Sequence, residues 1–364
     1  MNAELRTIPA TDGYRMPAEW EPHGGCYLAW PENTYFWRQG AKPVQHTVVA
    51  IADAIAATGE QVTVTVSSSQ YLHARLLLPD AVRVVEISTF NAWARDIAPS
   101  FLVDDHGGLR GVDWRFDGYG NRSPYWHLDN GYAARILDLE RLDRYAGPIV
   151  FEGGMIDVDG LGTGIVAAEC LLDPVRYRNP NRDTIIDAVR DYLGVRKLIW
   201  LPFGLVDDDT AGHMDNMARF VSPGTVALAW TGNERDPQFE RSAAAWELLT
   251  AETDADGKPL TVHKIPIPGP LHMTAEESLG TDIGARIDRT GQRLAGSYLN
   301  FYISNGAVLI PALDPATDDE AAAILSGLLP GREPIQLPSR ELLLGGGNIH
   351  CATRQIPATT RRQS

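Results

Sequence analysis

The sequence predicts an α/β fold, because short apolar segments alternate with segments of helical periodicity along all 364 residues. Turn residues, 34 Gly and 24 Pro, separate these segments. The expected strands are rich in Val, Ile, Leu or aromatic residues: Gln61–Val66, Val82–Ile87, Lys197–Leu201, Thr225–Trp230, Tyr298–Ile303 and Ala307–Ile310. Helices are expected where apolar residues recur three or four positions apart: Val44–Ile55, Ile185–Leu193 and Ala321–Leu328.

The chain is expected to form one domain, residues 1–358, followed by a disordered tail, residues 359–364. Its length would allow two or three domains of about 150 residues. However, no low-complexity segment or charge block marks a linker, and the polar stretch Glu252–Pro259 is interpreted as a loop. Units of helix plus strand recur at irregular spacings, which allows a pseudo-repeated architecture without showing one.

Composition and charge exclude several classes of function. The 47 acidic against 32 basic residues, a formal net charge of −15, argue against nucleic acid as a partner and favour a small cation, although such a charge also serves solubility. The N-terminus lacks a signal-peptide pattern and no apolar run reaches about 18 residues, so no membrane span is expected.

Three cysteines cannot form a disulfide framework, which favours a reducing, cytoplasmic location. Cys26 and Cys170 lie in apolar segments and are expected in the core. The dinucleotide motif Gly-x-Gly-x-x-Gly and the phosphate motif Gly-Lys-Ser/Thr are absent, so nucleotide chemistry is not expected.

Two segments place a carboxylate where it could meet a planar cation. In Asn91–Asp96, Trp93 and Asp96 lie three residues apart, so a cation could stack on the ring and pair with the carboxylate. The alternative is a local contact of Arg95 with either residue and no ligand. In Phe151–Thr163, paired glycines and an Asp-Gly-x-Gly stretch indicate a strand, a tight turn shaped by aspartates and a return strand. Glu152 is then expected at a strand end, beside backbone that the glycines allow to approach closely.

A third segment, Gly204–Asn216, carries four carboxylates and an imidazole after the expected strand Lys197–Leu201. If its last five residues are extended, His213 and Asp215 point to the same side and one ligand can touch both. Two alternatives remain open for this segment. One is a divalent metal site built from the His-x-Asp pair and the neighbouring aspartates, and the other is a solvated acidic turn.

The last segment, Leu342–Thr353, has three consecutive glycines followed by His350 and Cys351. We expect Leu342–Leu344 to be a strand and the glycines to allow a sharp backbone path. A cysteine is more often a small buried hydrophobe than a nucleophile. The glycine run and the distant His213 nevertheless favour Cys351 as a reactive thiol. His350 would point away from Cys351 in a strand, so it is interpreted as structural.

Together these segments resemble the agmatine deiminase and bacterial-type peptidylarginine deiminase family, within the guanidine-modifying superfamily. The similarity runs from Arg15–His23 to the Gly-Gly-Gly-Asn-Ile-His-Cys stretch at Gly345–Cys351, which is nearly the whole chain. Between these two segments lie three motifs in one order: Trp-x-Arg-Asp, Glu-Gly-Gly and Gly-His-x-Asp-Asn. Each motif alone is a weak sign of the family, but the set is specific. Trp30–Glu32 and Trp37–Pro43 also resemble agmatine deiminase sequences.

The resemblance implies the pentein fold, an α/β propeller of five ββαβ modules around a central site. It implies a hydrolase without metal or other cofactor, acting on agmatine or a related alkylguanidine to give the ureido product and ammonia through a covalent thiouronium intermediate. That activity would belong to putrescine synthesis, with a small cationic guanidine as partner and a homo-oligomer allowed. At matching positions the resemblance gives the nucleophile Cys351, the general acid/base His213, its neighbouring carboxylate Glu152, and the guanidinium-binding Asp96 and Asp215. Trp93 is also expected to bind substrate. Positive charge on the imidazole and the substrate would lower the pKa of the thiol and the carboxylates would raise it, a balance that the sequence leaves open.

Three departures from the usual agmatine deiminase pattern leave the substrate open. They are Phe90-Asn91 where Asn-Asp is usual, Phe116–Gly120 where Phe-Asn-Ala-Trp-Gly is usual, and Ala211 in place of a polar residue. A modified alkylguanidine or a peptidyl-arginine is therefore an alternative substrate. Other classes are an amidinotransferase, which passes the amidino group to an amine, and a metal-dependent amidinohydrolase, which releases urea. A binding protein on an inactive scaffold is disfavoured by the five matching residues.

Overall fold

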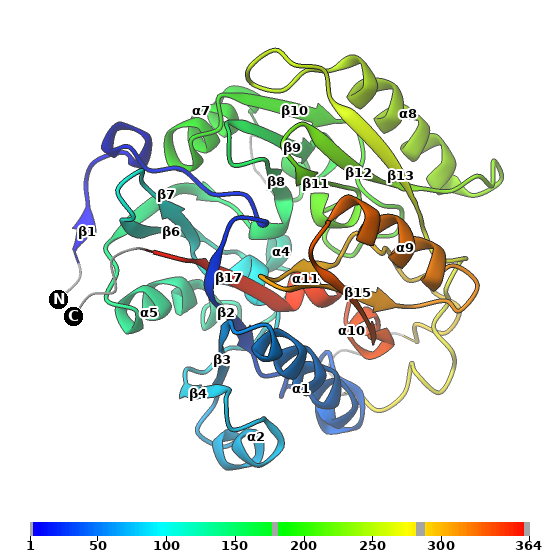
Figure 1. Cartoon of the computed structure of the whole chain (residues 1–364). Helices are drawn as coiled ribbons and strands as arrows, with labels where there is room; N and C mark the ends of the chain where they lie inside the picture. Colours follow the sequence, from blue (N-terminus) through cyan, green and yellow to red (C-terminus); the bar gives the residue numbers. More distant parts are fainter. Residues whose placement is uncertain (1–2, 177–180, 282–287, 360–364) are drawn as a thin grey trace.

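The computed structural model describes residues 3–176, 181–281 and 288–359, whose strands form five sheets arranged around a common centre (Figure 1). Each sheet contains an antiparallel pair of strands, and a helix then leads to a third strand parallel to the second. This unit is the ββαβ module, and its recurrence in all five sheets confirms the predicted α/β propeller.

We call the first strand of each module inner, the second middle and the third outer. The inner strands are β5 (Ser100–Val103), β8 (Ile156–Val158), β11 (Ala218–Ser222), β14 (Tyr302–Ile303) and β17 (Thr353–Pro357). The middle strands paired with them are β6 (Leu109–Arg115), β9 (Thr163–Ala167), β12 (Thr225–Trp230), β15 (Ala307–Ala312) and β2 (His23–Ala29). The outer strands are β7 (Arg144–Val150), β10 (Lys197–Leu201), β13 (Thr261–Pro266), β16 (Glu333–Pro338) and β3 (Gln61–Val66). Two edge strands, β1 (Glu4–Leu5) and β4 (Arg83–Glu86), extend the sheets of β7 and β3.

Five crossover helices connect middle to outer strands and lie toward the rim in Figure 1. They are α1 (Lys42–Ala57), α5 (Tyr132–Leu139), α7 (Arg182–Leu193), α8 (Pro237–Ala251) and α9 (Asp318–Leu328). The shorter helices are α2 (Tyr71–Leu77), α3 (Ala94–Ile97), α4 (Gly118–Asn121), α6 (Ala168–Leu171), α10 (Arg340–Leu344) and α11 (Ile349–Ala352). Single 3-10 turns are η1 (Pro9–Asp12), η2 (Arg38–Ala41), η3 (Asp129–Gly131), η4 (Gly153–Met155) and η5 (Met214–Asn216). No helix in the described part of the chain combines the length and apolarity needed to cross a bilayer.

Local sequence accounts for the crossover helices and middle strands. The side chain of Asn181 accepts from the Asp183 N–H at the start of α7, and Gly194 ends the helix with a φ of 74°. Asp236 caps α8 in the same way. Three of the middle strands, β9, β12 and β15, are nearly continuous apolar runs, as expected of strands that are covered on both faces; Val226–Ala229 of β12 are at most 1% exposed.

Most of the predicted elements are confirmed. The strands predicted at Gln61–Val66, Lys197–Leu201 and Thr225–Trp230 have the expected bounds, and each predicted helical segment lies within α1, α7 or α9. The predicted turn also joins β8 to β9, where Asp159 accepts from the N–H groups of Leu161 and Thr163. Glu252–Pro259 is a loop, and Cys26 and Cys170 are buried.

The prediction of a strand over Tyr298–Ile303 is wrong for most of its length. Only Tyr302 and Ile303 pair with β15, and the four residues before them form a turn. The whole segment is buried, because it approaches the centre of the molecule, and its apolar composition therefore does not distinguish strand from turn. Of the tail predicted at 359–364, residues 360–364 lie outside the described residues.

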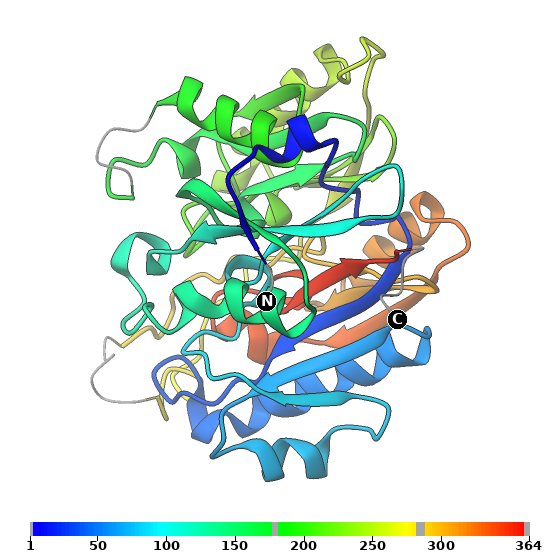
Figure 2. The same cartoon turned by 90° about the vertical axis from the view of Figure 1, so that its left-hand side faces the viewer.

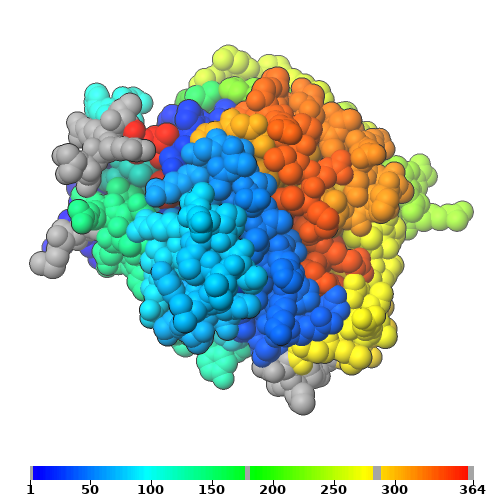
Figure 3. Space-filling view, turned by 60° about the horizontal axis from the view of Figure 1, so that its bottom comes forward, coloured from blue at the N-terminus to red at the C-terminus, as the bar shows by residue number. Residues whose placement is uncertain are grey.

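The two ends of the chain close the propeller. β17 pairs antiparallel with β2, so the last inner strand belongs to the same module as the first middle strand; the two lie side by side in Figure 2. Figure 3 shows the neighbouring surface, where the blue first part of the chain lies beside the orange segment that precedes β17. Helix α1 packs there against α10 and β16.

Candidate active site

The residues singled out from the sequence occupy equivalent places in different modules. Asp96 lies in α3 just before β5, Glu152 just before η4 and β8, His213 and Asp215 just before β11, and Cys351 in α11 just before β17. Each side chain is therefore delivered to the centre by the segment that enters an inner strand. The fifth module contributes Asn300, which lies just before β14 and which the sequence analysis missed.

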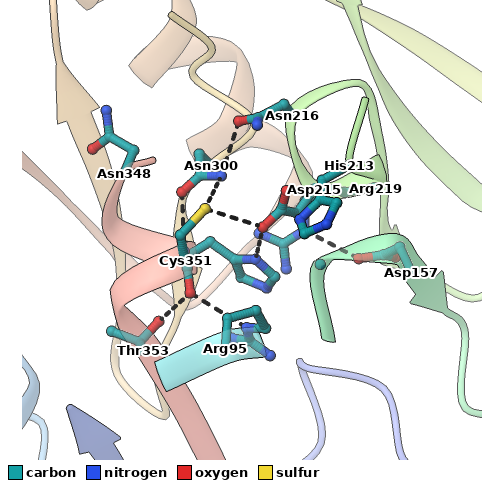
Figure 4. A network of polar contacts seen from close by, with 12 residues as sticks. Arg95, Asp157, His213, Asp215, Asn216, Arg219, Asn300, Asn348, Cys351 and Thr353 are labelled. Carbon is teal, nitrogen blue, oxygen red and sulfur yellow. Dashed lines mark hydrogen bonds and ion pairs between the residues drawn. The ribbon is translucent and has the colours of Figure 1, made fainter. Parts of the chain in front are cut away.

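The sulfur of Cys351 is surrounded by polar groups (Figure 4). Its Sγ lies 3.1 Å from Asn300 Nδ2 and 3.5 Å from Asp215 Oδ2. The amide of Asn300 also accepts the Cys351 N–H and donates to Asn216, so its orientation is fixed by three contacts. Burial and the charges of Asp215 and Asp96 raise the pKa of the thiol well above its usual value, against the lowering effect of Asn300.

His213 is fully buried and held from one side. Its Nε2 lies 2.7 Å from Glu152 Oε2, and the same oxygen accepts from Arg176 Nη1 at 2.8 Å. Burial lowers the pKa of His213, but the charges of Asp96 and Glu152 and the contact with Glu152 outweigh it and raise this pKa to about 9. Burial raises the pKa of Glu152, but Arg176 and His213 hold it below its usual value. The pair is therefore an imidazolium beside a carboxylate at neutral pH.

The other ring nitrogen of His213 faces the two remaining carboxylates. Nδ1 lies 3.7 Å from Asp96 Oδ1 and has no hydrogen-bond partner among the described residues. Asp96 accepts from the Gly154 N–H at 3.0 Å and from the Tyr119 hydroxyl at 3.0 Å. Burial, Glu152 and Asp215 raise the pKa of Asp96 to about 6, although His213 lowers it.

Gly154 marks the point where these groups converge. A Cβ atom on this residue would lie 2.4 Å from His213 Nδ1, 3.1 Å from Asp96 Oδ1 and 3.2 Å from Asp215 Oδ2. A glycine is therefore required here by the close approach of three polar side chains. A planar cation between Asp96 and Asp215 would lie beside both His213 and the nearby sulfur.

Trp93 lies at the same centre but in an apolar contact. Its ring packs against Trp37 with ring centroids 5.4 Å apart, and a Cβ on Gly347 would come within 2.9 Å of it. The glycine run before Cys351 thus passes directly over the indole ring. The structure brings Trp93 to the site, but only 5% of the residue is exposed.

The segment around His213 is not extended, the condition under which His213 and Asp215 were expected to point to the same side. Met214–Asn216 is a 3-10 turn, and His213 and Asp215 meet because this turn wraps around the buried centre. Asp207 and Asp209 are exposed and Asp208 accepts from Thr210, so these three residues form the acidic turn that was one of the alternatives. Within residues 3–176, 181–281 and 288–359, no three His, Cys, Asp or Glu side chains are placed as a metal-ligand set.

Two predictions about the segment around Cys351 are also wrong. The residues before the glycines form helix α10, where Leu342, Leu343 and Leu344 pack into the core, and the strand prediction failed because an apolar run this short fits either element. The interpretation of His350 as a structural residue directed away from the site assumed a strand. In helix α11 its ring instead reaches Asp215, with Nδ1 2.7 Å from Oδ2.

Arg95 does not make the local contact that was the alternative for its segment. Its guanidinium donates to the backbone oxygen of His350 and to the side chains of Gln355 and Glu19. Asp96 thereby remains directed toward Gly154.

The departures from the family pattern lie close to the site. Tyr119, with a φ of 59°, fills the position where the usual pattern has Trp and donates to Asp96. Asn91 accepts from the Trp93 N–H and lies 3.5 Å from the Tyr119 hydroxyl. Ala211, with a φ of 63°, precedes the segment of His213. The departures were the signal in the sequence that could have identified Tyr119 and Asn91 as residues that support the site.

Comparison with known proteins agrees with this geometry over nearly the whole chain. The model of the family described as Porphyromonas-type peptidyl-arginine deiminase matches residues 15–357. The chain is 48% identical over 360 residues to the agmatine deiminase of Pseudomonas aeruginosa (strain LESB58), covering 97% of this chain and 98% of that protein. It is 47% identical over 369 residues to the agmatine deiminase of Pseudomonas putida (strain KT2440), covering 98% and 99% of the two chains.

Among solved structures, the agmatine deiminase of Enterococcus faecalis matches with a TM-score of 0.94 and 35% identity, covering 98% of this chain and 100% of that one. The expected resemblance is thus confirmed both by the fold and by the length of the sequence match. With five modules, a buried thiol among carboxylates and these similarities, the chain belongs to the Porphyromonas-type peptidyl-arginine deiminase family, and the three relatives named above are agmatine deiminases.

Proposed function

We propose that this protein is an agmatine deiminase that hydrolyses the guanidinium group of agmatine to a ureido group and ammonia. The observation that carries the proposal is the convergence on Gly154 of His213, Asp96 and Asp215, with the sulfur of Cys351 within 3.5 Å of Asp215. Two buried carboxylates, an imidazole and a thiol match what a planar cation needs in order to be held and attacked.

Cys351 is the proposed nucleophile, because a guanidinium carbon is shielded by delocalised charge and requires a soft, strong nucleophile. Asp96 and Asp215 hold the guanidinium nitrogens and orient its carbon toward Sγ. Binding of the cation lowers the pKa of Cys351, and the S–H proton passes to bulk water. As the resulting thiolate forms the S–C bond, His213 gives a proton to one amino nitrogen, the C–N bond breaks and ammonia leaves. The product of this half-reaction is a thiouronium cation on Cys351, with His213 neutral.

Water completes the reaction. Neutral His213 takes a proton from a water molecule that attacks the thiouronium carbon, and collapse of the adduct breaks the C–S bond. The released groups are the thiol of Cys351 and the ureido product, so agmatine and water give the N-carbamoyl amine and ammonia. Glu152, fixed by Arg176, orients the imidazole and favours its charged form throughout.

The burial of the site favours a small free guanidine over an arginine within a protein chain. Glu152, His213 and Asp215 are 0% exposed, and Cys351 and Asp96 are 4% and 5% exposed. A backbone on both sides of the reacting side chain could not follow it into so closed a centre, whereas agmatine carries only a tetramethylene amine. The relatives that carry the name agmatine deiminase support the same choice.

Other features of the proposal concern the protein as a whole. We propose a cytoplasmic enzyme, since its three cysteines are free and buried. We also propose one catalytic domain over residues 1–358, closed by the pairing of β17 with β2, that works without metal or other cofactor and for which a homo-oligomer is allowed.

The test is a panel of agmatine, free arginine, a peptidyl-arginine and simple alkylguanidines, scored for ammonia and for ureido product. Wild-type protein should prefer agmatine and release ammonia without an acceptor amine, and Cys351→Ala should abolish turnover at every substrate concentration. Turnover that requires an amine acceptor would identify an amidinotransferase, and release of urea an amidinohydrolase. Activity that persists in Cys351→Ala would refute the thiol mechanism.

A further inference from the structure

His350 lies between two buried carboxylates, of which only one belongs to the proposed substrate site. Its Nδ1 is 2.7 Å from Asp215 Oδ2, and its Nε2 is 2.8 Å from Glu19 Oε2. The residue is 3% exposed, so water cannot take the place of either partner. The backbone is fixed as well, because its N–H donates to the Asn300 carbonyl and its carbonyl accepts from Arg95.

Both carboxylates are held in their ionised form. Burial raises the pKa of Asp215, but its hydrogen bond with His350 and that residue's charge keep it below the usual value. Burial likewise raises the pKa of Glu19, but Arg219, His350 and Arg95 hold it well below the usual value. A neutral imidazole has one N–H and could donate to only one of these oxygens. A ring with its proton on Nδ1 donates to Asp215, and the short contact of Nε2 with Glu19 fixes the orientation of the same ring.

Glu19 is the rigid end of this chain of contacts. Its Oε2 lies 3.0 Å from Arg219 Nη2 and 3.2 Å from Arg95 Nη2, and its Oε1 accepts from the Ile303 N–H at 2.9 Å. Arg219 is itself fixed by Asp157 at 3.1 Å. The charged groups that face the ring are therefore Asp215, Glu19 and the two arginines, and the ring takes its position from this cluster.

Asp215 is the end of the chain of contacts that faces the proposed substrate site. Its Oδ2 accepts from His350 and lies near the Cys351 sulfur, whereas its Oδ1 is buried and has no hydrogen-bond partner among the described residues. The imidazole thus holds Oδ2, the oxygen that lies beside Cys351 and Gly154, and so fixes the carboxylate that faces the centre. Resting on the deiminase function proposed above, we propose that His350 is a positioning residue that is anchored beside Glu19 and, by donating from Nδ1, keeps Asp215 aimed at the substrate guanidinium.

Two substitutions separate this role from a merely structural one. The amide of Asn in His350→Asn lies near the position of Nδ1 and can still donate to Asp215. The longer side chain in His350→Gln places its amide near the position of Nε2 and can donate only to Glu19. We expect kcat/KM for agmatine to fall about ten- to a hundredfold in His350→Gln, mostly through a higher KM, and several-fold less in His350→Asn.

His350→Gln cannot donate to Asp215, so this variant should also change the pH profile. Without that hydrogen bond the pKa of Asp215 rises, and the acidic limb of kcat/KM is expected at higher pH than in the wild type. The matched control is His23→Gln, which removes another buried histidine that lies 3.4 Å from a carboxylate, that of Glu60. His23 contacts none of the proposed site residues through its ring, so KM and pH profile should not change. Thermal unfolding of all variants accounts for any loss of folded protein.

The wild-type assay comes first and tests the proposed function by itself. If wild-type protein turns over agmatine while His350→Gln keeps the wild-type KM and pH profile, the positioning role is wrong and the deiminase function stands. Equal losses in His350→Asn and His350→Gln would also overturn it, since the donor toward Asp215 would then be irrelevant. A measurement independent of activity is the ¹⁵N spectrum of the imidazoles, assigned with His350→Asn. A proton on Nδ1 of His350 is expected, and an unprotonated Nδ1 would refute the hydrogen bond donated to Asp215.

Discussion

Replacing Gly154 by alanine should inactivate the protein while leaving it folded. The added Cβ would lie 2.4 Å from His213 Nδ1, about 1 Å inside ordinary van der Waals contact, and within 3.2 Å of oxygens of Asp96 and Asp215. The backbone of Gly154 does not have a positive φ, so alanine itself is not strained. The whole effect therefore falls on the three side chains.

The magnitude follows from how these side chains are held. His213 cannot move away freely, because its other nitrogen is 2.7 Å from Glu152, which Arg176 fixes at 2.8 Å. The imidazole or the Asp96 carboxylate must shift by about 1 Å, and a misplacement of that size costs roughly a hundredfold in rate. That corresponds to about 2.7 kcal/mol in the activation free energy. The overpacking itself should lower the free energy of unfolding by about 1–3 kcal/mol.

The assay is ammonia release from agmatine across a range of concentrations, with unfolding in urea measured on the same samples. Gly327→Ala is the control, because a Cβ there meets nothing within 4 Å and the residue lies in helix α9, where alanine is preferred. The control should keep full activity and be slightly more stable. A Gly154→Ala variant with kcat/KM within threefold of wild type would show that the convergence on Gly154 is not where the guanidinium is held.

Three further predictions follow from neighbouring groups. Tyr119→Phe removes the hydroxyl that donates to Asp96 at 3.0 Å, and kcat/KM should fall about tenfold; an unchanged value would mean that this hydrogen bond does not matter. The pKa of His213, about 9 when folded against 6.5 ordinarily, means that its stabilisation is full below pH 6.5 and is lost toward pH 9. Between pH 6.5 and 8.5 the free energy of unfolding in urea should therefore fall by about 2 kcal/mol in the wild type and by clearly less in His213→Gln. Because the pKa of Cys351 is raised, neutral iodoacetamide should alkylate it slowly at pH 7 and about tenfold faster with each pH unit, whereas the cation 2-chloroacetamidine should react faster at pH 7. Mass spectrometry should find the other two cysteines unmodified in the folded protein, and their modification would contradict the burial described above.

The sequence was sufficient for those elements whose residues follow one periodicity throughout. The strand of Thr225–Trp230 and the helix around Ile185–Leu193 were located correctly because apolar composition, caps and turn residues agree there. Tyr298–Phe301 was misassigned because all four residues are buried by their place at the centre and not by their place in a sheet. The fivefold repetition was not visible, because only the geometry of the modules recurs and not their residues.

The site residues also divide into those that the sequence identifies and one that only the structure shows. Motifs that follow one another in a specific order were enough to single out five residues that the structure brings together: Cys351, His213, Glu152, Asp96 and Asp215. Asn300 could not be found in this way, because nothing in Tyr298–Ile303 distinguishes it from a polar residue in a turn. Its place at the site becomes visible only once the modules are known, because Asn300 lies just before β14 as Cys351 lies just before β17.

In the proposed mechanism, the electrostatics of the site connect recognition of the substrate to activation of the thiol. Burial and the two carboxylates Asp215 and Asp96 raise the pKa of Cys351, so without a ligand the thiol is neutral and a poor nucleophile. A guanidinium held between these carboxylates brings the positive charge that offsets them, and it lowers the pKa of the thiol by the same interactions that bind it. A neutral analogue of the same shape would fill the centre without supplying that charge. Selectivity for cations should therefore be larger in the rate of S–C bond formation than in binding, because only a cation creates the thiolate that attacks it.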